Sequence, residues 1–455
     1  MTRSAIALAL ALAAGPALAA PAAPKPTPPP APKPQAQPVA PAAPPARVLT
    51  LEEALRIGLT RQPQLQQARG ATDAAKARVD QALAPLLPQL SGSAFYERYQ
   101  TSTSSSGGGA ALGLGRTTGA QDLWSAEVTG RQLLYDFGQT SDRWRAARAS
   151  SASLEETERV TVETVALGIR TAYFNAVAAK ALVGVAQETL DNETKHLEQI
   201  RGYVDVGSRP QIDYVSEQAN YANARVKLIQ AQNGYATARI LVEQAIGVTD
   251  LGTWEVAQES LPPVQGESSA PETLLAEALQ SRPDIATLQR QLDAQKLTTS
   301  AIQGAYGPSL SLTGAYSQVG PATNDLSQNW NYQLVLSWPF FQGGLTRGQV
   351  RESRANEVQL VAQIEQERQQ VRVDVEQARL GVVAAIATLD AAKDASEAAR
   401  ERLTLAEGRY ETGVGNVIEL SDAQLQLSTA LGQQVQSEFQ LAVARSQLLR
   451  ALGRS

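Results

Sequence analysis

The sequence Val371-Arg-Val-Asp-Val375-Glu-Gln-Ala378 begins a run in which apolar or small residues recur at alternating steps of four and three up to Tyr410. The positions are Val371, Val375, Ala378, Val382, Ala385, Leu389, Ala392, Ser396, Ala399, Leu403, Ala406 and Tyr410. A heptad seam of about five repeats predicts one long helix in coiled-coil-like packing. A helix of an ordinary bundle is the alternative, because such helices show similar spacing.

The same pattern occurs a second time, 206 residues earlier, as the spacing of Gly207 and Gly413 illustrates. The earlier positions are Val165, Ile169, Ala172, Ala176, Ala179, Val183, Ala186, Leu190, Glu193, Leu197, Ile200 and Val204. Only Glu193 breaks this copy. Near the start of each copy the offset is larger, as between Pro63 and Pro283, so copy one contains an insertion, which we place at residues 102–119. The chain is therefore predicted to be internally duplicated.

The amino-acid composition excludes several kinds of functional site for this chain. The 455 residues carry a net charge of −5, contain no cysteine and include a single histidine, His196. Disulfides, thiolate metal sites and cysteine nucleophiles are excluded, and little acid–base or zinc chemistry is available. The sequence shows no basic face of the kind that would bind nucleic acid. We therefore predict no enzyme, cofactor or metal site. We interpret His196 and the pair Glu155–Glu156 as solvated helix surface, and the Asn192 sequon as a chance match.

The N-terminal residues indicate export. Arg3, the apolar run that follows it and Ala17-Leu-Ala19 predict a signal peptide over residues 1–19; a short membrane anchor is the alternative. Residues 20–46, rich in Pro and Ala, predict a disordered spacer, with a partner-binding arm as the alternative. The remaining chain divides into a first repeat at 47–247, a linker at 248–270 and a second repeat at 271–455.

Each repeat is predicted to contain a helix, two strands, a long helix and a return helix. The first helix spans about residues 51–84 in one copy and 271–302 in the other. The long helices continue without proline or a capping glycine to Gly207 and Gly413, roughly 65 residues or about 100 Å. The return helices end at Gly247 and Gly453, which suit C-terminal caps. This geometry predicts a tube.

The predicted strands alternate between apolar and polar residues, which indicates a sheet with one polar and one apolar face. A soluble β-sandwich is the alternative, but one hairpin per copy leaves no second sheet to cover the apolar face. The aromatic residues of that face fit the girdle of an outer-membrane barrel: Tyr96, Trp124, Tyr316, Trp330, Tyr332 and Trp338. Four strands cannot close a barrel, so several chains must contribute to one.

In this order, these features resemble the TolC-like outer-membrane efflux proteins from Leu51 to Gly453. The matching residues include the opening Leu51-Glu-Glu-Ala-Leu with Pro63-Gln-Leu, the exit from the sheet Tyr135-Asp-Phe-Gly, and Gly413 followed six residues later by Glu419. Each motif is short and weak alone. Their order, present twice, is specific.

The resemblance implies a mainly α fold with a pair of β-hairpins. Three chains would form a twelve-stranded β-barrel in the outer membrane of a Gram-negative bacterium, continued by a long periplasmic α-helical barrel. It implies a homotrimer that contacts outer-membrane lipid and works with a periplasmic adaptor (membrane fusion) protein and an inner-membrane pump of the RND or ABC class. The implied function is an exit duct for drugs or secreted proteins.

The resemblance also assigns roles at the two turns between long and return helices. Glu419 and Asp422 match carboxylates that ring the family's periplasmic entrance, and we place Asp213 with them; a solvated helix start is the alternative. The family's entrance is held shut through an arginine where this chain has Gly415. Arg209 in the first copy and Tyr410 are therefore candidates for a rearranged tip latch.

A second functional hypothesis is a periplasmic or surface coiled-coil scaffold, adaptor or adhesin stalk without a channel. It explains the long helices equally well. It leaves two hairpins with apolar faces at matched positions unexplained, and the duct is therefore favoured.

Overall fold

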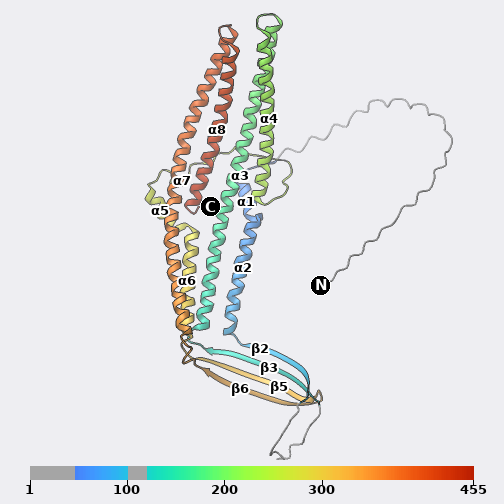
Figure 1. Cartoon of the computed structure of the whole chain (residues 1–455), viewed down its shortest axis with the longest axis vertical. Coiled ribbons are helices and arrows are strands. Elements are labelled where there is room, and N and C mark those ends of the chain that lie inside the picture. The colour runs from blue at the N-terminus through green and yellow to red at the C-terminus, as the bar shows by residue number, and fades with distance from the viewer. Residues whose placement is uncertain (1–46, 101–119, 455) are drawn as a thin grey trace, which may run out of the picture. The chain divides into compact units, whose positions relative to one another are not determined.

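The computed structural model describes residues 47–100 and 120–454. The predicted signal peptide, the spacer and the insertion at 102–119 lie outside the described residues. The described part is mostly helical, and both halves follow the order helix, helix, strand, strand, long helix, helix (Figure 1). The first half comprises β1 Arg47–Leu49, α1 Leu51–Arg61, α2 Pro63–Leu83, a 3₁₀ turn Ala84–Leu86, β2 Gln89–Tyr99, β3 Gln121–Tyr135, α3 Gln139–Asp205 and α4 Gln211–Ile246. The second comprises β4 Trp254–Val256, α5 Pro271–Ser281, α6 Pro283–Gly304, β5 Ser309–Ala322, β6 Asp325–Ser337, α7 Leu345–Glu411 and α8 Val417–Ala451.

Both long helices confirm the predicted length, and α7 confirms the predicted heptad seam. Helices α3 and α7 contain 67 residues each, which corresponds to about 100 Å. All twelve seam positions from Val371 to Tyr410 are buried. Both helices end just before a glycine in the left-handed region, Gly207 at φ +76° and Gly413 at φ +80°, where a side chain would be strained.

The prediction of a single first helix in each half is wrong. Helix α1 ends at Arg61 and α2 begins at Pro63, while α5 and α6 are separated in the same way before Pro283. Proline disfavours the helical conformation for the residue that precedes it. Gln62 and Arg282 are accordingly extended, with ψ of 123° and 126°, and each proline starts the next helix.

At one end of the helices, the four long strands form a single antiparallel sheet in the order β2-β3-β5-β6 (Figure 1). The two hairpins are joined by pairing of β3 with β5, for example Val128 with Tyr316. In the described part of the chain, the outer edges of β2 and β6 pair with no further strand.

Residues 248–270, predicted as a linker, contain structure that the sequence did not indicate. Strand β4 pairs in parallel with β1, in the register Arg47 with Trp254 and Leu49 with Val256. Trp254 and Val256 are buried in the core between α1, α3 and α4. Beyond β4 the segment is held on α8 by Arg445, which pairs with Glu267.

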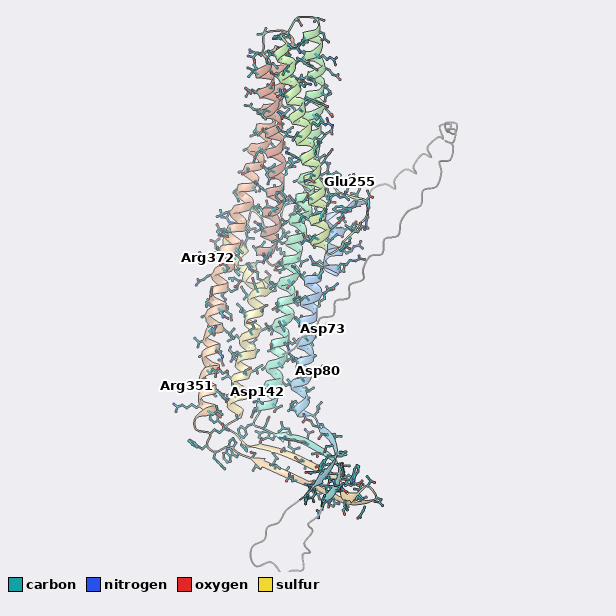
Figure 2. All side chains as sticks on the ribbon, turned by 45° about the vertical axis from the view of Figure 1, so that its right-hand side comes forward. Asp73, Asp80, Asp142, Glu255, Arg351 and Arg372 are labelled. Carbon is teal, nitrogen blue, oxygen red and sulfur yellow. The ribbon has the colours of Figure 1, made fainter. Side chains whose placement is uncertain are left out.

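Side chains cover the helices along their whole length (Figure 2). Charged residues such as Asp73 and Asp80 on α2 and Arg351 and Arg372 on α7 are exposed (Figure 2). Among the described helices, none combines the length and the apolar composition that crossing a bilayer requires.

Candidate functional site

The two turns that join long and return helices lie together at the end of the molecule opposite the sheet (Figure 1). Gly207 and Gly413 turn the chain there, and α4 and α8 begin at Gln211 and Val417. We call this end, residues 193–217 and 399–424, the tip. An apolar cluster that includes Ile200, Leu403 and Leu420 packs α3, α7 and α8 together at this level.

The predicted entrance acids lie at the tip, in different environments. Glu419 is in the first turn of α8, where its N–H donates to the capping Asn416 side chain at 2.8 Å. Its half-exposed carboxylate lies 3.3 Å from the Arg409 guanidinium. Asp422, one turn further, is exposed and lines a pocket between α4 and α8. Asp213 on α4 is 9% exposed.

The candidate latch residues are in direct contact. The Arg209 Nη2 donates a 3.0 Å hydrogen bond to the backbone carbonyl of Tyr410, and the guanidinium carbon lies 4.5 Å from the centre of the Tyr410 ring. This contact joins the turn after α3 to the end of α7. Tyr410 is 2% exposed, and its hydroxyl has no hydrogen-bond partner among the described residues.

The groups around Tyr410 change the pKa of its phenol. Burial raises the pKa of its phenol, the Arg209 charge opposes the shift, and the negative charges of Asp213 and Glu217 add to it. Asp213 is thus close to the latch residues. Arg209 contacts the carbonyl and the ring of Tyr410 rather than its hydroxyl. This geometry depends on the packing of four helices and could not be deduced from the sequence.

The interpretation of His196 as a solvated histidine is wrong. Its side chain is 12% exposed, and Nε2 lies 3.4 Å from the Glu407 carboxylate. The contact links α3 to α7 three residues before Tyr410. The only available signal was position, because His196 directly precedes the seam residue Leu197 and therefore lies at the edge of the packed face.

Two further glutamates of the tip were not predicted as functional. Glu193 on α3 and Glu217 on α4 are 7% and 0% exposed, and each has one carboxylate oxygen without a hydrogen-bond partner in the described part of the chain. Glu193 also lines the pocket of about 450 Å³ that Asp422 and Gln424 share. The sequence signal for Glu193 was its position, because it is the one residue that interrupts the heptad seam of the first copy.

At the opposite end, the strand register places the predicted girdle residues of the strands on one face. Direct partners and alternate residues of a strand share a face. Tyr96 pairs with Trp124, Val128 pairs with Tyr316, and Tyr316 pairs with Trp330. Tyr332 follows Trp330 by two residues, and their rings stack at 5.6 Å. The opposite face is mainly polar: Ser91, Ser93, Ser125, Glu127, Thr129, Arg131, Ser311, Thr313, Ser317, Asn329, Asn331 and Gln333.

The prediction that Trp338 continues this strand pattern is wrong. Strand β6 ends at Ser337, because Pro339 lacks a backbone donor and restricts the residue before it. Trp338 still lies at the helical end of the sheet, where its Nε1 donates to the Tyr306 carbonyl at 3.1 Å.

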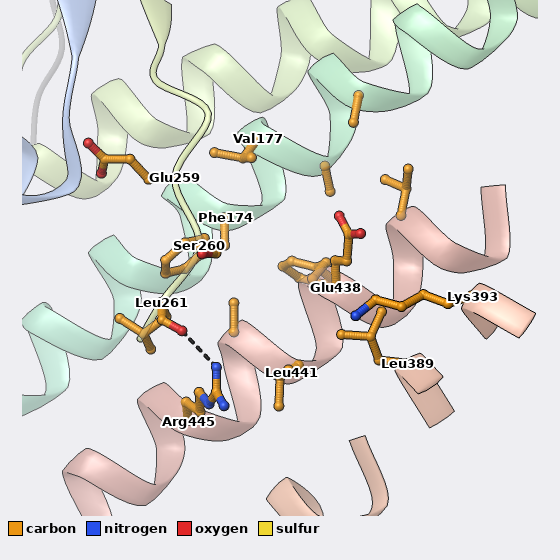
Figure 3. Close-up of a pocket in the computed structure, with 15 residues that line it drawn as sticks. Phe174, Val177, Glu259, Ser260, Leu261, Leu389, Lys393, Glu438, Leu441 and Arg445 are labelled. Atoms are coloured by element: carbon orange, nitrogen blue, oxygen red, sulfur yellow. Dashed lines mark hydrogen bonds between the residues drawn. The ribbon is translucent and has the colours of Figure 1, made fainter. Parts of the chain in front are cut away.

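A second pocket, of about 380 Å³, lies midway along the helices between α3, α8 and residues 259–261 (Figure 3). Arg445 closes one side by donating to the Leu261 carbonyl at 2.7 Å, and Lys393 and Glu438 border the other side (Figure 3). Within residues 47–100 and 120–454, no three His, Cys, Asp or Glu side chains are grouped to hold a metal ion.

Known proteins resemble this arrangement along most of the chain. Residues 55–248 and 274–454 match the family model described as "Outer membrane efflux protein". The chain is 25% identical over 411 residues to outer membrane protein TolC of Escherichia coli, covering 86% of this chain and 79% of TolC. It is 27% identical to protein CyaE of Bordetella pertussis, covering 91% and 86%. The CmeC outer membrane channel of Campylobacter jejuni superposes with a TM-score of 0.77 at 18% identity, covering 89% of this chain and 85% of that channel.

Proposed function

This chain belongs to the outer membrane efflux protein family and acts as an outer-membrane exit duct of efflux or secretion systems, and we propose that three copies build each duct. Members of this family are channels rather than enzymes. The observation that carries the trimer is the sheet. It has one aromatic and aliphatic face, one polar face, and two edges, β2 and β6, without partners in the described chain.

Unpaired backbone groups at a sheet edge are costly in lipid, and a barrel removes them. Four strands are too few to close, since about eight is the practical minimum. Three chains of four strands give twelve, with Trp124, Trp330 and Tyr332 facing lipid and the polar face lining the bore. The helices of the three chains would continue this barrel into the periplasm. We also propose that residues 47–247 and 271–455 are two copies of one TolC-like unit.

At the tip, Glu419 and Asp422 of three chains would form two stacked acidic rings at the periplasmic entrance. A narrow mouth bounded by protein concentrates their field and favours cations. The contact between Arg209 and Tyr410 would hold the tip packed. The partners are a periplasmic adaptor protein and an inner-membrane pump of the RND or ABC class, and the pump determines the cargo.

Outer-membrane fractions of cells that express the tagged protein test this proposal. We expect a band at three times the chain mass on gels of unheated samples and a single-chain band after heating. Crosslinking before purification should recover the adaptor and the pump. A folded monomer that inserts alone into lipid would contradict the trimer.

A further inference from the structure

The two halves of the chain differ at one level of the tip in a way that packing does not require. At the offset of 206 residues, Glu193 corresponds to Ala399 and Glu217 corresponds to Ala423. Both alanines are buried, at 8% and 0% exposure. The α7–α8 hairpin therefore packs with two methyl groups where the α3–α4 hairpin contains two carboxyl groups. Burying carboxylates without charge partners is costly, so the acids need another explanation.

The buried glutamates, which we call the acid pair, lack charge partners. No Lys, Arg or His nitrogen of the described chain lies within 4.0 Å of either carboxylate, and Glu193 Oε2 and Glu217 Oε1 accept no hydrogen bond. The other oxygen of Glu217 accepts from Asn220 Nδ2 at 3.2 Å. The same nitrogen lies 3.1 Å from the Ser421 hydroxyl. Glu217 is thus connected through Asn220 to α8.

The two carboxyl groups lie close enough for the charge of Glu217 to act on Glu193. Two neighbouring ionised carboxylates repel one another, which favours a proton on one of them. Burial, first, and then the neighbouring carboxyl group of Glu217 raise the pKa of Glu193 to about 8, while Lys227 acts in the opposite direction. Because the groups interact closely, the proton belongs to the pair.

Other polar groups surround the acid pair on all four helices. Glu188 on α3 and Asp422 on α8 line the pockets that Glu193 borders, and Lys227 on α4 is exposed. On α7, Tyr410 is close enough for Glu217 to affect its phenol. Gln424 on α8 is 6% exposed with both amide atoms unpartnered. Its amide could solvate the pair once water entered.

We propose that Glu193 and Glu217 form a proton-binding site in the wall of the tip, and that a bound proton keeps α3, α4 and α8 packed. Release of the proton leaves two adjacent buried carboxylates that repel one another and must hydrate through the neighbouring pocket of about 450 Å³. Hydration separates α3 and α4 from α8 and loosens the nearby latch. The coupling to opening rests on the proposed function of the tip as the entrance; the proton site itself does not.

Infrared titration of the purified full chain in detergent tests the site. We expect a buried protonated-carboxyl band that disappears as the pH rises from about 7 to 9. The band should be missing from Glu193→Gln/Glu217→Gln and from Glu193→Ala/Glu217→Ala, which copies the other hairpin. Glu198→Gln, an exposed change on the same helix, should retain it. A band that titrates between about pH 7 and 9 and persists in the Gln pair, or the absence of that band from the wild type, would overturn the proton site.

Planar-bilayer recordings test the coupling. The open fraction of the wild type and of Glu198→Gln should rise several-fold across the same pH interval, and the Gln pair should stay closed throughout. A Gln pair with the pH response of the wild type overturns the coupling. If the infrared band titrates as expected but no variant conducts at any pH, the proposed function fails and the proton site stands.

Discussion

Replacing Arg209 by alanine should favour the open tip. The substitution removes the 3.0 Å hydrogen bond from Nη2 to the Tyr410 carbonyl and the guanidinium that lies 4.5 Å from the ring centre. The affected interaction connects the two helical hairpins of the tip, so its loss acts on their separation rather than on either hairpin alone.

The size of the effect follows from the two contacts. A hydrogen bond that involves a charged group contributes about 1.5–3 kcal/mol, and a cation–π contact contributes about 0.5–2 kcal/mol. Arg209 is partly exposed, which reduces both contributions. A net loss of about 1–3 kcal/mol per chain changes the ratio of open to closed tips by about 5- to 150-fold.

Tyr410→Phe provides the discriminating comparison. It keeps the carbonyl and the ring and removes only a buried hydroxyl that has no partner among the described residues. We expect it to be neutral or to stabilise the closed tip slightly. Arg201→Ala is the matched control, because Arg201 is an exposed arginine near the same end of α3.

Single-channel recordings in planar bilayers measure the open fraction directly. The expected order is Arg209→Ala well above wild type, with Tyr410→Phe and Arg201→Ala close to wild type. If Arg209→Ala matches Arg201→Ala, the contact does not hold the tip. If Tyr410→Phe opens the channel as strongly as Arg209→Ala, the hydroxyl carries the latch and the geometry described above is not the one that matters.

Further predictions concern other parts of the molecule. Glu419→Ala/Asp422→Ala should reduce cation selectivity and weaken block by a trivalent cation added from the periplasmic side; unchanged block would show that these acids do not line the entrance. Arg445→Ala leaves Glu267, 13% exposed, without its partner and should lower stability by about 3 kcal/mol, seen as a lower Tm and faster proteolysis of residues 257–267. An unchanged Tm would show that this segment is not held by the ion pair. Burial raises the pKa of Glu163 on α3 to about 7, so the folded chain binds this proton more tightly than the unfolded chain does. The stability should therefore decline as pH rises from about 4.5 to 7. Glu163→Gln should flatten that decline in thermal melts, and an identical pH profile would contradict it.

The sequence predicted the elements whose causes are local. The uninterrupted heptads predicted α7. Gly207 predicted the end of α3, and Gly413 predicted the end of α7. The alternation of apolar and polar residues predicted the strands and their two faces. The break before Pro63 also has a local cause, because proline disfavours the helical conformation of Gln62. Features that depend on distant contacts could not be predicted. They include the burial of His196 against Glu407 and the contact of Arg209 with the Tyr410 carbonyl.

The ribbon of β1 and β4 has a consequence for the order of folding. Arg47 pairs with Trp254, and the Tyr173 hydroxyl donates to the Leu49 carbonyl at 3.2 Å, so the first described strand is completed only by residues about two hundred positions later. Contacts of such large sequence separation form slowly, because the entropy of loop closure must be lost before they stabilise anything. When the chain is synthesised from its N-terminus, α1 and α3 cannot complete their packing until the middle of the chain is present. The first half therefore completes its core only when the second half has begun to appear, which couples the maturation of the two halves in time.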